Sequence, residues 1–194
     1  VYESLGEPVP SFVDVPIIQA QPVSADTPLN GLSTPTIDGK ADEDEWAKAA
    51  VYTQADGTPL AGFEVTLDNE NLYIKANAAQ NASLPAKVGI YVLSPKTAYP
   101  NSFTVAAENE KSALLNFAVS YAFIWDGGQA LSAYAAGADG WRVADNATVG
   151  SAAASGKVLE TAIPLSIFGK LGSGDDLRLA VVAQPANQVI PAAG

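Results

Sequence analysis

Aromatic residues beside two turns carry the clearest chemical signal in the sequence. Trp125 directly precedes an Asp-Gly-Gly turn at residues 126–128, and Trp141 directly follows an Ala-Asp-Gly turn at residues 138–140. An aromatic face at a loop tip can stack on the apolar face of a sugar ring, while polar neighbours bind its hydroxyl groups. The alternative is that both rings cap the ends of a hydrophobic core.

Polar and aromatic residues around these turns form the predicted ligand-binding set. Its members are Trp125, Tyr134, Trp141, Asp126, Asp139 and Arg142. Asn146 is a further polar neighbour. Such a set can bind a glycan without a cofactor, so we expect a binding function here.

Acidic residues near the start of the predicted domain suggest a metal site. Asp38, Asp42 and Asp44 supply hard oxygen ligands close together, as calcium prefers, although their spacing does not match an EF-hand. The alternative is a solvated acidic turn at the positive end of a short helix. We therefore expect no required cofactor and treat the three aspartates as candidate ligands of a structural calcium ion.

The composition excludes several kinds of catalysis. The 194 residues include no Cys, no His and no Met. A Ser-His-Asp triad, a thiol nucleophile and haem ligation through His or Met are therefore impossible. A glycosidase would need two carboxylates across a cleft, and the sequence singles out no such pair. We expect that the protein is not an enzyme.

The charge balance limits the partners. Lys and Arg number 10 against 21 Asp and Glu, which gives a formal net charge of −11. Nucleic acid is not expected as a partner because phosphate binding needs a basic surface. No apolar run is long enough for membrane insertion. A chain without Cys or Met tolerates oxidants, which favours an extracellular or cell-surface location.

Proline and alternation divide the chain into two parts. Residues 1–35 are rich in proline and are predicted to form a linker or extended arm, in which residues 13–18 (VDVPII) could pair at a sheet edge. Residues 36–194 are predicted to form one binding domain. Period-two alternation predicts a hairpin over residues 63–76 and one strand over residues 116–125 with a single apolar face from Phe117 to Trp125.

Further short strands and turns complete the predicted architecture. Strands are expected over residues 87–93, 102–107, 131–135, 141–143, 158–163 and 177–183, and the end of a strand at residues 36–37. Short helical turns are expected within residues 41–50 and 164–169, and a loop over residues 185–194. Together they predict an all-β, antiparallel β-sandwich with one or two short helical turns.

Three segments resemble a known family. The sequence IDGKADEDEW at residues 37–46 resembles the IDG-x-x-D-E-x-x-W opening of family 9 carbohydrate-binding modules. Residues 65–74 resemble the hairpin that follows, and residues 158–169 with 175–181 are similar to the closing segment. The resemblance covers roughly residues 36–183 and includes the C-terminal modules of glucodextranases and amylopullulanases. It implies a sandwich shared with DOMON-type domains, glucan or xylan binding, and structural calcium in several members. It also implies a structural role for Trp46 as a core anchor, for which the alternative is a sugar-stacking platform.

Two functional hypotheses follow. The first is a non-catalytic extracellular carbohydrate-binding module for a glucan-type polysaccharide, attached to a larger parent protein. The second is a structural module of a cell-surface layer or filament, in which the arm adds a strand to the sheet of another copy. Asn81 and Asn146 each begin an N-glycosylation acceptor pattern, which is consistent with either extracellular role.

Overall fold

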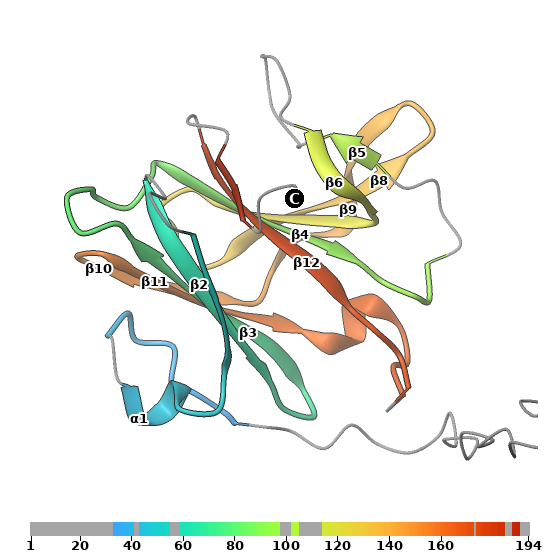
Figure 1. The fold of residues 1–194 in the computed structure, drawn as a ribbon. Coiled ribbons are helices and arrows are strands. Elements are labelled where there is room, and N and C mark those ends of the chain that lie inside the picture. Colours follow the sequence, from blue (N-terminus) through green and yellow to red (C-terminus); the bar gives the residue numbers. More distant parts are fainter. Residues whose placement is uncertain are drawn as a thin grey trace, which may run out of the picture.

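Two antiparallel sheets make up most of the described structure (Figure 1). The computed structural model describes residues 33–40, 43–54, 59–97, 102–104, 114–172, 174–184 and 188–190. Within these residues the first sheet has the order β1 (Ala50–Thr53), β2 (Leu60–Leu67), β3 (Asn71–Ala78), β11 (Val158–Pro164) and β10 (Ser151–Ser155). The second has the order β13 (Gln188–Ile190), β12 (Arg178–Gln184), β4 (Lys87–Leu93), β7 (Tyr121–Trp125), β8 (Leu131–Gly137) and β9 (Gly140–Val149). The predicted all-β sandwich is confirmed.

Smaller elements lie outside the two sheets. β5 (Ser102–Thr104) and β6 (Leu114–Val119) form a separate two-stranded sheet, and β6 contacts β4 and β12. In the described part of the chain the helical elements are α1 (Glu43–Trp46) and the 3-10 turn η3 (Leu165–Phe168). Both expected helical turns are therefore present. No helix among the described residues is long and apolar enough to cross a membrane.

The main hydrophobic core lies between the two sheets. Phe63 and Ile74 of the first sheet pack with Ile90, Phe123 and Val181 of the second, and each of these side chains is fully buried. Successive side chains in a strand point to opposite faces, so every second residue from Phe63 to Leu67 in β2 and from Leu72 to Ala76 in β3 contacts this core. The predicted hairpin over residues 63–76 is confirmed by the β2–β3 pairing.

A second apolar cluster covers the outer face of the second sheet. Tyr91, Ile124 and Val182 point away from the main core and pack against Leu115 and Val119 of β6. The second sheet is therefore buried on both faces over its central strands, which leaves less of its surface for a ligand.

The prediction of one strand over residues 116–125 is wrong. The chain bends at Ser120, so Val119 joins the outer cluster while Phe123 joins the main core. Ser120 N donates to Val92 O (2.8 Å), and Ala136 N donates to Ser120 O (2.9 Å). The apolar alternation continues through the bend, so the sequence pattern does not reveal that the chain changes sheets.

Three strands were not predicted, and one expected strand is absent. β1 and β10 are short and lack clear alternation, and β13 lies in the end of the chain that was expected to be a loop. No strand occurs at residues 36–37, where the backbone instead leads into the bend at Asp38 and Gly39. Residues 1–32, and so nearly all of the predicted arm, lie outside the described residues.

Candidate functional site

The opening motif of the family resemblance is held by a buried carboxylate. Glu160 of β11 is fully buried. It accepts hydrogen bonds from the indole Nε1 of Trp46 (3.0 Å) and the backbone N of Gly39 (2.9 Å) and Asp38 (3.2 Å). Burial raises the pKa of Glu160, and the three donors oppose this by stabilising its charge. Glu160 therefore fixes the start of the domain to the first sheet.

A buried lysine completes this structural cluster. Lys75 lies between Glu64 and Glu160 in the strand register, and its Nζ is 2.9 Å from Glu64 Oε1 and 5.2 Å from the centre of the Trp46 ring. Trp46 also packs against Tyr73 and is only 2% exposed. Its ring has no face available to a sugar, which agrees with the structural role expected for Trp46.

The candidate calcium ligands do not form a cluster in the described residues. Asp38 is exposed and accepts from Lys40 N (2.9 Å) and Lys40 Nζ (2.6 Å). Those hydrogen bonds lower the pKa of Asp38. Asp44 is exposed, and Asp42 lies outside the described residues. Among the residues that the structure describes, no group of three acidic side chains is placed to hold a metal ion. A calcium site stays a prediction.

Trp125 belongs to the core rather than to the surface. Its side chain is only 8% exposed, packs in the main core, and donates from Nε1 to Gly128 O (2.9 Å). Asp126 is exposed in the same turn. The indole thus ties the β7–β8 turn to the end of the core, which favours the core-capping alternative for this tryptophan.

Trp141 and Tyr134 lie on the outer face of the second sheet. Both are half-buried against the outer cluster, and the Trp141 ring meets Tyr91 edge to face at a centroid distance of 5.9 Å. Asp139 is exposed in the β8–β9 turn. Tyr134 and Trp141 share one face of β8 and β9, because Tyr134 pairs with Val143, two residues from Trp141.

The structure does not bring Trp125 and Trp141 together. The first faces the main core and the second faces the outer cluster, on opposite sides of the same sheet. Their turns also lie at opposite ends of β8, whose seven residues span roughly 20 Å at about 3.3 Å per residue. The six predicted residues therefore do not form one site.

Arg142 lies on the other side of β9 from Trp141 and lines a cleft of about 270 Å³. We call this opening the Arg142 cleft. The residues that line it are Thr97, Ser120, Tyr121, Ala135, Ala136, Arg142, Val143, Ala144, Asp145, Asn146 and Ile167. Its lining comes from the β4–β5 connection, the β6–β7 bend, β7, β8, β9 and η3.

A bulge in β9 shapes one wall of the Arg142 cleft. Ser132 pairs with Thr148 and Tyr134 pairs with Val143, so residues 144–147 face only Ala133 across the ladder. Bulges of this kind redirect side chains and are common beside binding sites. The result is that Asp145 and Asn146 line the same cleft as Arg142.

The part of the Arg142 cleft formed by Thr97, Ser120 and Tyr121 is held rigid by packing and hydrogen bonds. The Tyr121 ring meets Phe168 edge to face at 5.8 Å between centroids and lies 6.2 Å from Phe123. Thr97 Oγ1 donates to Ser94 O (2.8 Å) and lies 2.8 Å from Ser120 Oγ. A fixed aromatic wall and fixed hydroxyl groups are pre-organised for a ligand, because little side-chain entropy is lost on binding.

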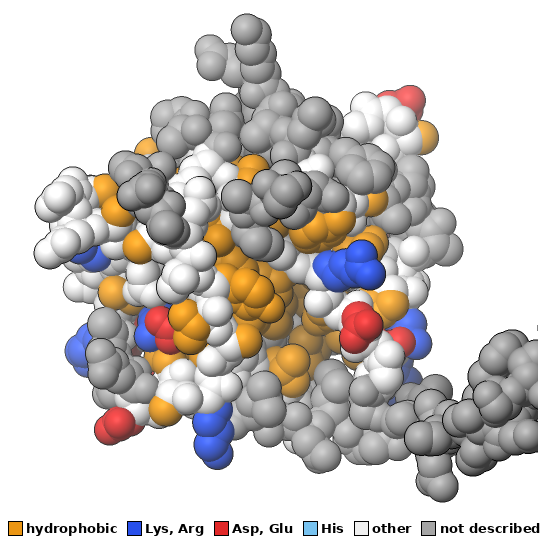
Figure 2. Space-filling model, in the orientation of Figure 1, with side chains coloured by type: hydrophobic (Ala, Val, Ile, Leu, Met, Phe, Trp, Pro, Cys, Tyr) orange, Lys and Arg blue, Asp and Glu red, His pale blue; other side chains and the backbone are white. Residues whose placement is uncertain are grey.

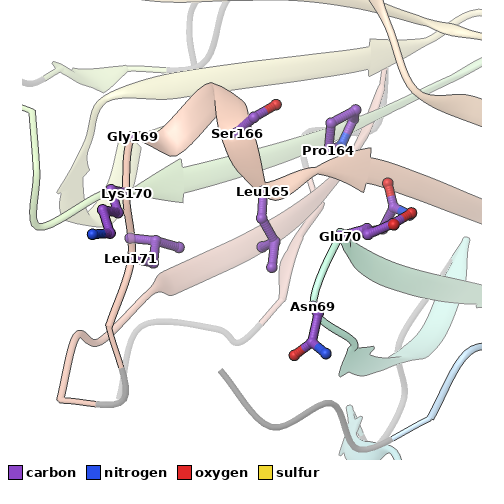
Figure 3. Close-up of a pocket in the computed structure, with 9 residues that line it drawn as sticks. Asn69, Glu70, Pro164, Leu165, Ser166, Gly169, Lys170 and Leu171 are labelled. Atoms are coloured by element: carbon purple, nitrogen blue, oxygen red, sulfur yellow. The ribbon is translucent and has the colours of Figure 1, made fainter. Parts of the chain in front are cut away.

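A larger hollow lies on the other side of η3. We call this opening of about 540 Å³ the Leu165 hollow. Its lining residues are Asn69, Glu70, Asn71, Pro164, Leu165, Ser166, Gly169, Lys170 and Leu171. Figure 3 shows Leu165 between Leu171 on one side and the Asn69–Glu70 turn on the other. Leu165 N donates to Glu70 O (2.8 Å), which joins the two walls.

The turn that borders the Leu165 hollow is built around Asp68. Its Oδ1 accepts from the backbone N of Glu70 and Asn71, each at 2.8 Å, and its Oδ2 accepts from Tyr73 OH at 2.7 Å. Partial burial of Asp68 raises its pKa, but the hydrogen bonds that stabilise the charged form outweigh this effect, so the pKa is lowered. Burial, together with the hydrogen bond to Asp68, raises the pKa of Tyr73 to about 12.

The surface visible in Figure 2 carries both hydrophobic and charged side chains. Figure 2 shows hydrophobic side chains gathered in the middle of the view, between the β2–β3 and β12 regions of Figure 1, with charged side chains around them. The potential glycosylation residues Asn81 and Asn146 are both exposed.

Sequence reasoning found part of the Arg142 cleft and missed the rest. Arg142 was in the predicted set and Asn146 was named as a polar neighbour, but Tyr121, Asp145 and Thr97 were not identified. No local signal marks these three, because the bulge in β9 and the bend at Ser120 bring them into one opening.

Comparisons with known proteins do not assign the chain to a family. No protein-family model, curated protein or solved structure matches the chain. The resemblance to family 9 carbohydrate-binding modules therefore stays a prediction.

Proposed function

We propose that this domain is a non-catalytic module that binds a neutral glucan-type sugar in the Arg142 cleft. The observation that carries the proposal is the meeting of the half-buried Tyr121 ring with Arg142, Asp145 and Asn146 in one opening. An aromatic or apolar wall with a few convergent polar groups is the usual composition of a small-molecule site. Its volume, about 270 Å³, suits a small ligand such as a single sugar ring.

The presence of a single carboxylate in the described lining of the cleft favours binding over hydrolysis. Asp145 is the one carboxylate among the described residues that line it. Glycoside hydrolysis ordinarily needs two carboxylates on either side of the scissile bond. The proposed setting is outside the cell, and its support is the composition without Cys or Met.

Calorimetric titration of the whole chain with maltose, cellobiose, xylobiose and the matching longer oligosaccharides tests the proposal. Saturable binding of one series is expected. Arg142→Ala should weaken it roughly ten- to a hundredfold, because a charge-assisted hydrogen bond typically contributes about 1.5–3 kcal/mol. Arg178→Ala is the matched control, since Arg178 is exposed at the start of β12 and lies outside the cleft lining.

Two outcomes would contradict the proposal. One is the absence of heat of binding for every sugar from a chain that circular dichroism shows to be folded. The other is binding that Arg142→Ala and Arg178→Ala reduce equally, which would move the site away from the cleft.

A second candidate function, assembly between copies, is favoured by the edge strand β1. All four of its residues are exposed, including Val51 at 62% and Tyr52 at 42%. Gln54 N donates to Ala61 O (2.9 Å), so by alternation the amides of Val51 and Thr53 point away from β2. Within the described residues no strand pairs with this side of β1. Residues 13–18 of a second copy are the proposed occupant of this edge.

Sedimentation velocity over a range of protein concentrations separates this candidate from the first. Assembly through β1 should give concentration-dependent oligomers that Val51→Lys dissolves, because a charge on an edge strand opposes pairing. Val143→Lys, at a similarly exposed position in β9, is the control. A monomer at every concentration would remove the assembly candidate.

A further inference from the structure

The Arg142 cleft and the Leu165 hollow are separated by a single narrow ridge. Consecutive residues of η3 line one opening each: Ser166 borders the hollow and Ile167 borders the cleft. η3 has four residues and is about 8 Å long at a rise of about 2 Å per residue. The two openings therefore lie on either side of one helical turn.

The other end of the ridge gives the same result. Gly169 borders the hollow and lies next to Lys96. The two residues are so close that a Cβ added to Gly169 would lie 3.4 Å from Lys96 Cβ. The next residue, Thr97, borders the cleft. Ser94 Oγ donates to Phe168 O (3.1 Å), which fastens this connection to η3. Two independent crossings thus place the hollow directly beside the cleft.

The Leu165 hollow has a composition that continues the chemistry of the cleft. Leu165, Leu171 and Pro164 supply aliphatic surface, on which the CH groups of a sugar can pack (Figure 3). The polar side chains at its border are Asn69, Glu70, Asn71, Ser166 and Lys170. Amide, hydroxyl and ammonium groups can donate to or accept from sugar hydroxyls. Its volume of about 540 Å³ is larger than the 270 Å³ of the cleft, so it can hold at least one further sugar ring.

We infer that the Leu165 hollow is a second subsite for the same ligand, so that the module binds a glucan oligosaccharide that crosses η3 rather than a single sugar unit. This inference rests on the proposed function of the Arg142 cleft. Linking two weak subsites in one ligand raises affinity without any new kind of contact, because occupation of the first raises the local concentration at the second.

The test is the dependence of affinity on oligosaccharide length. Calorimetry on the whole chain, with the disaccharide through the hexasaccharide of the series that binds, should show a Kd that falls at least tenfold and then levels off. Ser166→Trp places a large side chain in the hollow at an exposed position. It should lower the ratio of disaccharide to hexasaccharide Kd by about tenfold, and Lys170→Ala should lower it severalfold.

Lys48→Ala removes the same charge as Lys170→Ala at an exposed position outside both openings, and should leave the Kd ratio at the wild-type value. Equal Kd values for the disaccharide and hexasaccharide would overturn the second subsite while leaving the proposed function in place. An unchanged ratio in Ser166→Trp would do the same. No binding of any oligosaccharide would overturn both.

Discussion

At the scale of single residues, the three tryptophans have three different environments. Trp46 donates to the buried Glu160, Trp125 donates to a carbonyl in an exposed turn, and Trp141 packs edge to face on Tyr91. Residue type alone therefore does not distinguish an anchor from a ligand platform. The partner of the indole and the exposure of the ring make that distinction.

Trp46→Phe is expected to destabilise the domain more than Trp125→Phe. Both changes remove an indole N–H and similar apolar area, and phenylalanine at position 46 keeps an aromatic ring beside Lys75. The main remaining difference between the two sites is therefore the acceptor that loses its donor. Losing the donor to buried Glu160 leaves a desolvated carboxylate oxygen and should cost about 1–3 kcal/mol beyond the packing loss. Losing the donor to Gly128, an exposed residue, should cost about 0.5–1.5 kcal/mol because water can replace it.

Urea unfolding followed by far-ultraviolet circular dichroism measures both variants without relying on tryptophan fluorescence. Equal losses of unfolding free energy would show that water reaches Glu160, contrary to its burial.

Tyr73 is expected to give the domain an alkaline instability. Burial and the hydrogen bond to Asp68 raise its pKa from 10.0 to about 12. Between these values the unfolded chain releases the Tyr73 proton while the folded chain keeps it. The stability contributed by Tyr73 is therefore complete below pH 10 and is lost as the pH rises towards 12.

Unfolding free energies of the wild type and Tyr73→Phe, measured across this alkaline range, check the expectation. The wild-type value should fall more steeply with pH than that of the variant. Tyr52→Phe is the control, because the Tyr52 ring is 42% exposed and does not contact Asp68. If the unfolding free energies of all three proteins fell equally with pH, the raised pKa of Tyr73 would not be the cause of the alkaline instability.

At the scale of elements, the turn at Asp38 and Gly39 depends on close approach to β10. Gly39 has φ +78°, and a Cβ there would lie 3.0 Å from the Ala154 carbonyl carbon. This position connects the start of the domain to β10 and, through Glu160, to β11. A side chain at Gly39 would strain the backbone and also force β10 to shift.

Gly39→Ala is expected to cost more stability than Gly156→Ala. Gly156, between β10 and β11, has φ +60° but open space around its Cβ position, so alanine there should cost about 1–2 kcal/mol from backbone strain alone. Gly39→Ala adds a steric clash with backbone and should cost at least about 1 kcal/mol more. Thermal unfolding of the two variants in parallel provides the comparison. A smaller loss for Gly39→Ala would mean that the turn is not held against β10.

At the scale of the whole molecule, the net charge of −11 leads to a test of the proposal that the ligand is a neutral glucan. A protein of this charge repels acidic polysaccharides, whereas a neutral glucan is unaffected. The dissociation constant for the glucan should therefore change less than about twofold between about 50 mM and about 500 mM NaCl, because screening acts only on charged partners.

Calorimetry at the two salt concentrations measures this directly, with polygalacturonate as an acidic comparison. Polygalacturonate should not bind at the lower concentration. A strong salt dependence for the glucan, or tight binding of polygalacturonate, would indicate a charged ligand instead of a neutral one.

The sequence by itself determined the local elements. Alternation over residues 63–76 predicted the β2–β3 hairpin, and Pro164 with Gly169 marked the limits of η3. Period-two patterns and turn residues act between close neighbours in the chain, so they can be interpreted without knowing the rest of the fold. The structural role of Trp46 was implied by the family resemblance, and its contact with Glu160 is in accord with it.

Only the tertiary structure decided which side chains share a surface. Alternation shows that a strand has two faces but not which neighbour covers each, and in the second sheet both faces are covered. For this reason Trp125 and Trp141 lie on opposite sides of that sheet, and the apolar run at residues 116–125 divides at Ser120. The Arg142 cleft likewise depends on pairing between β8 and β9, because the bulge opposite Ala133 aligns Asp145 and Asn146 with Arg142.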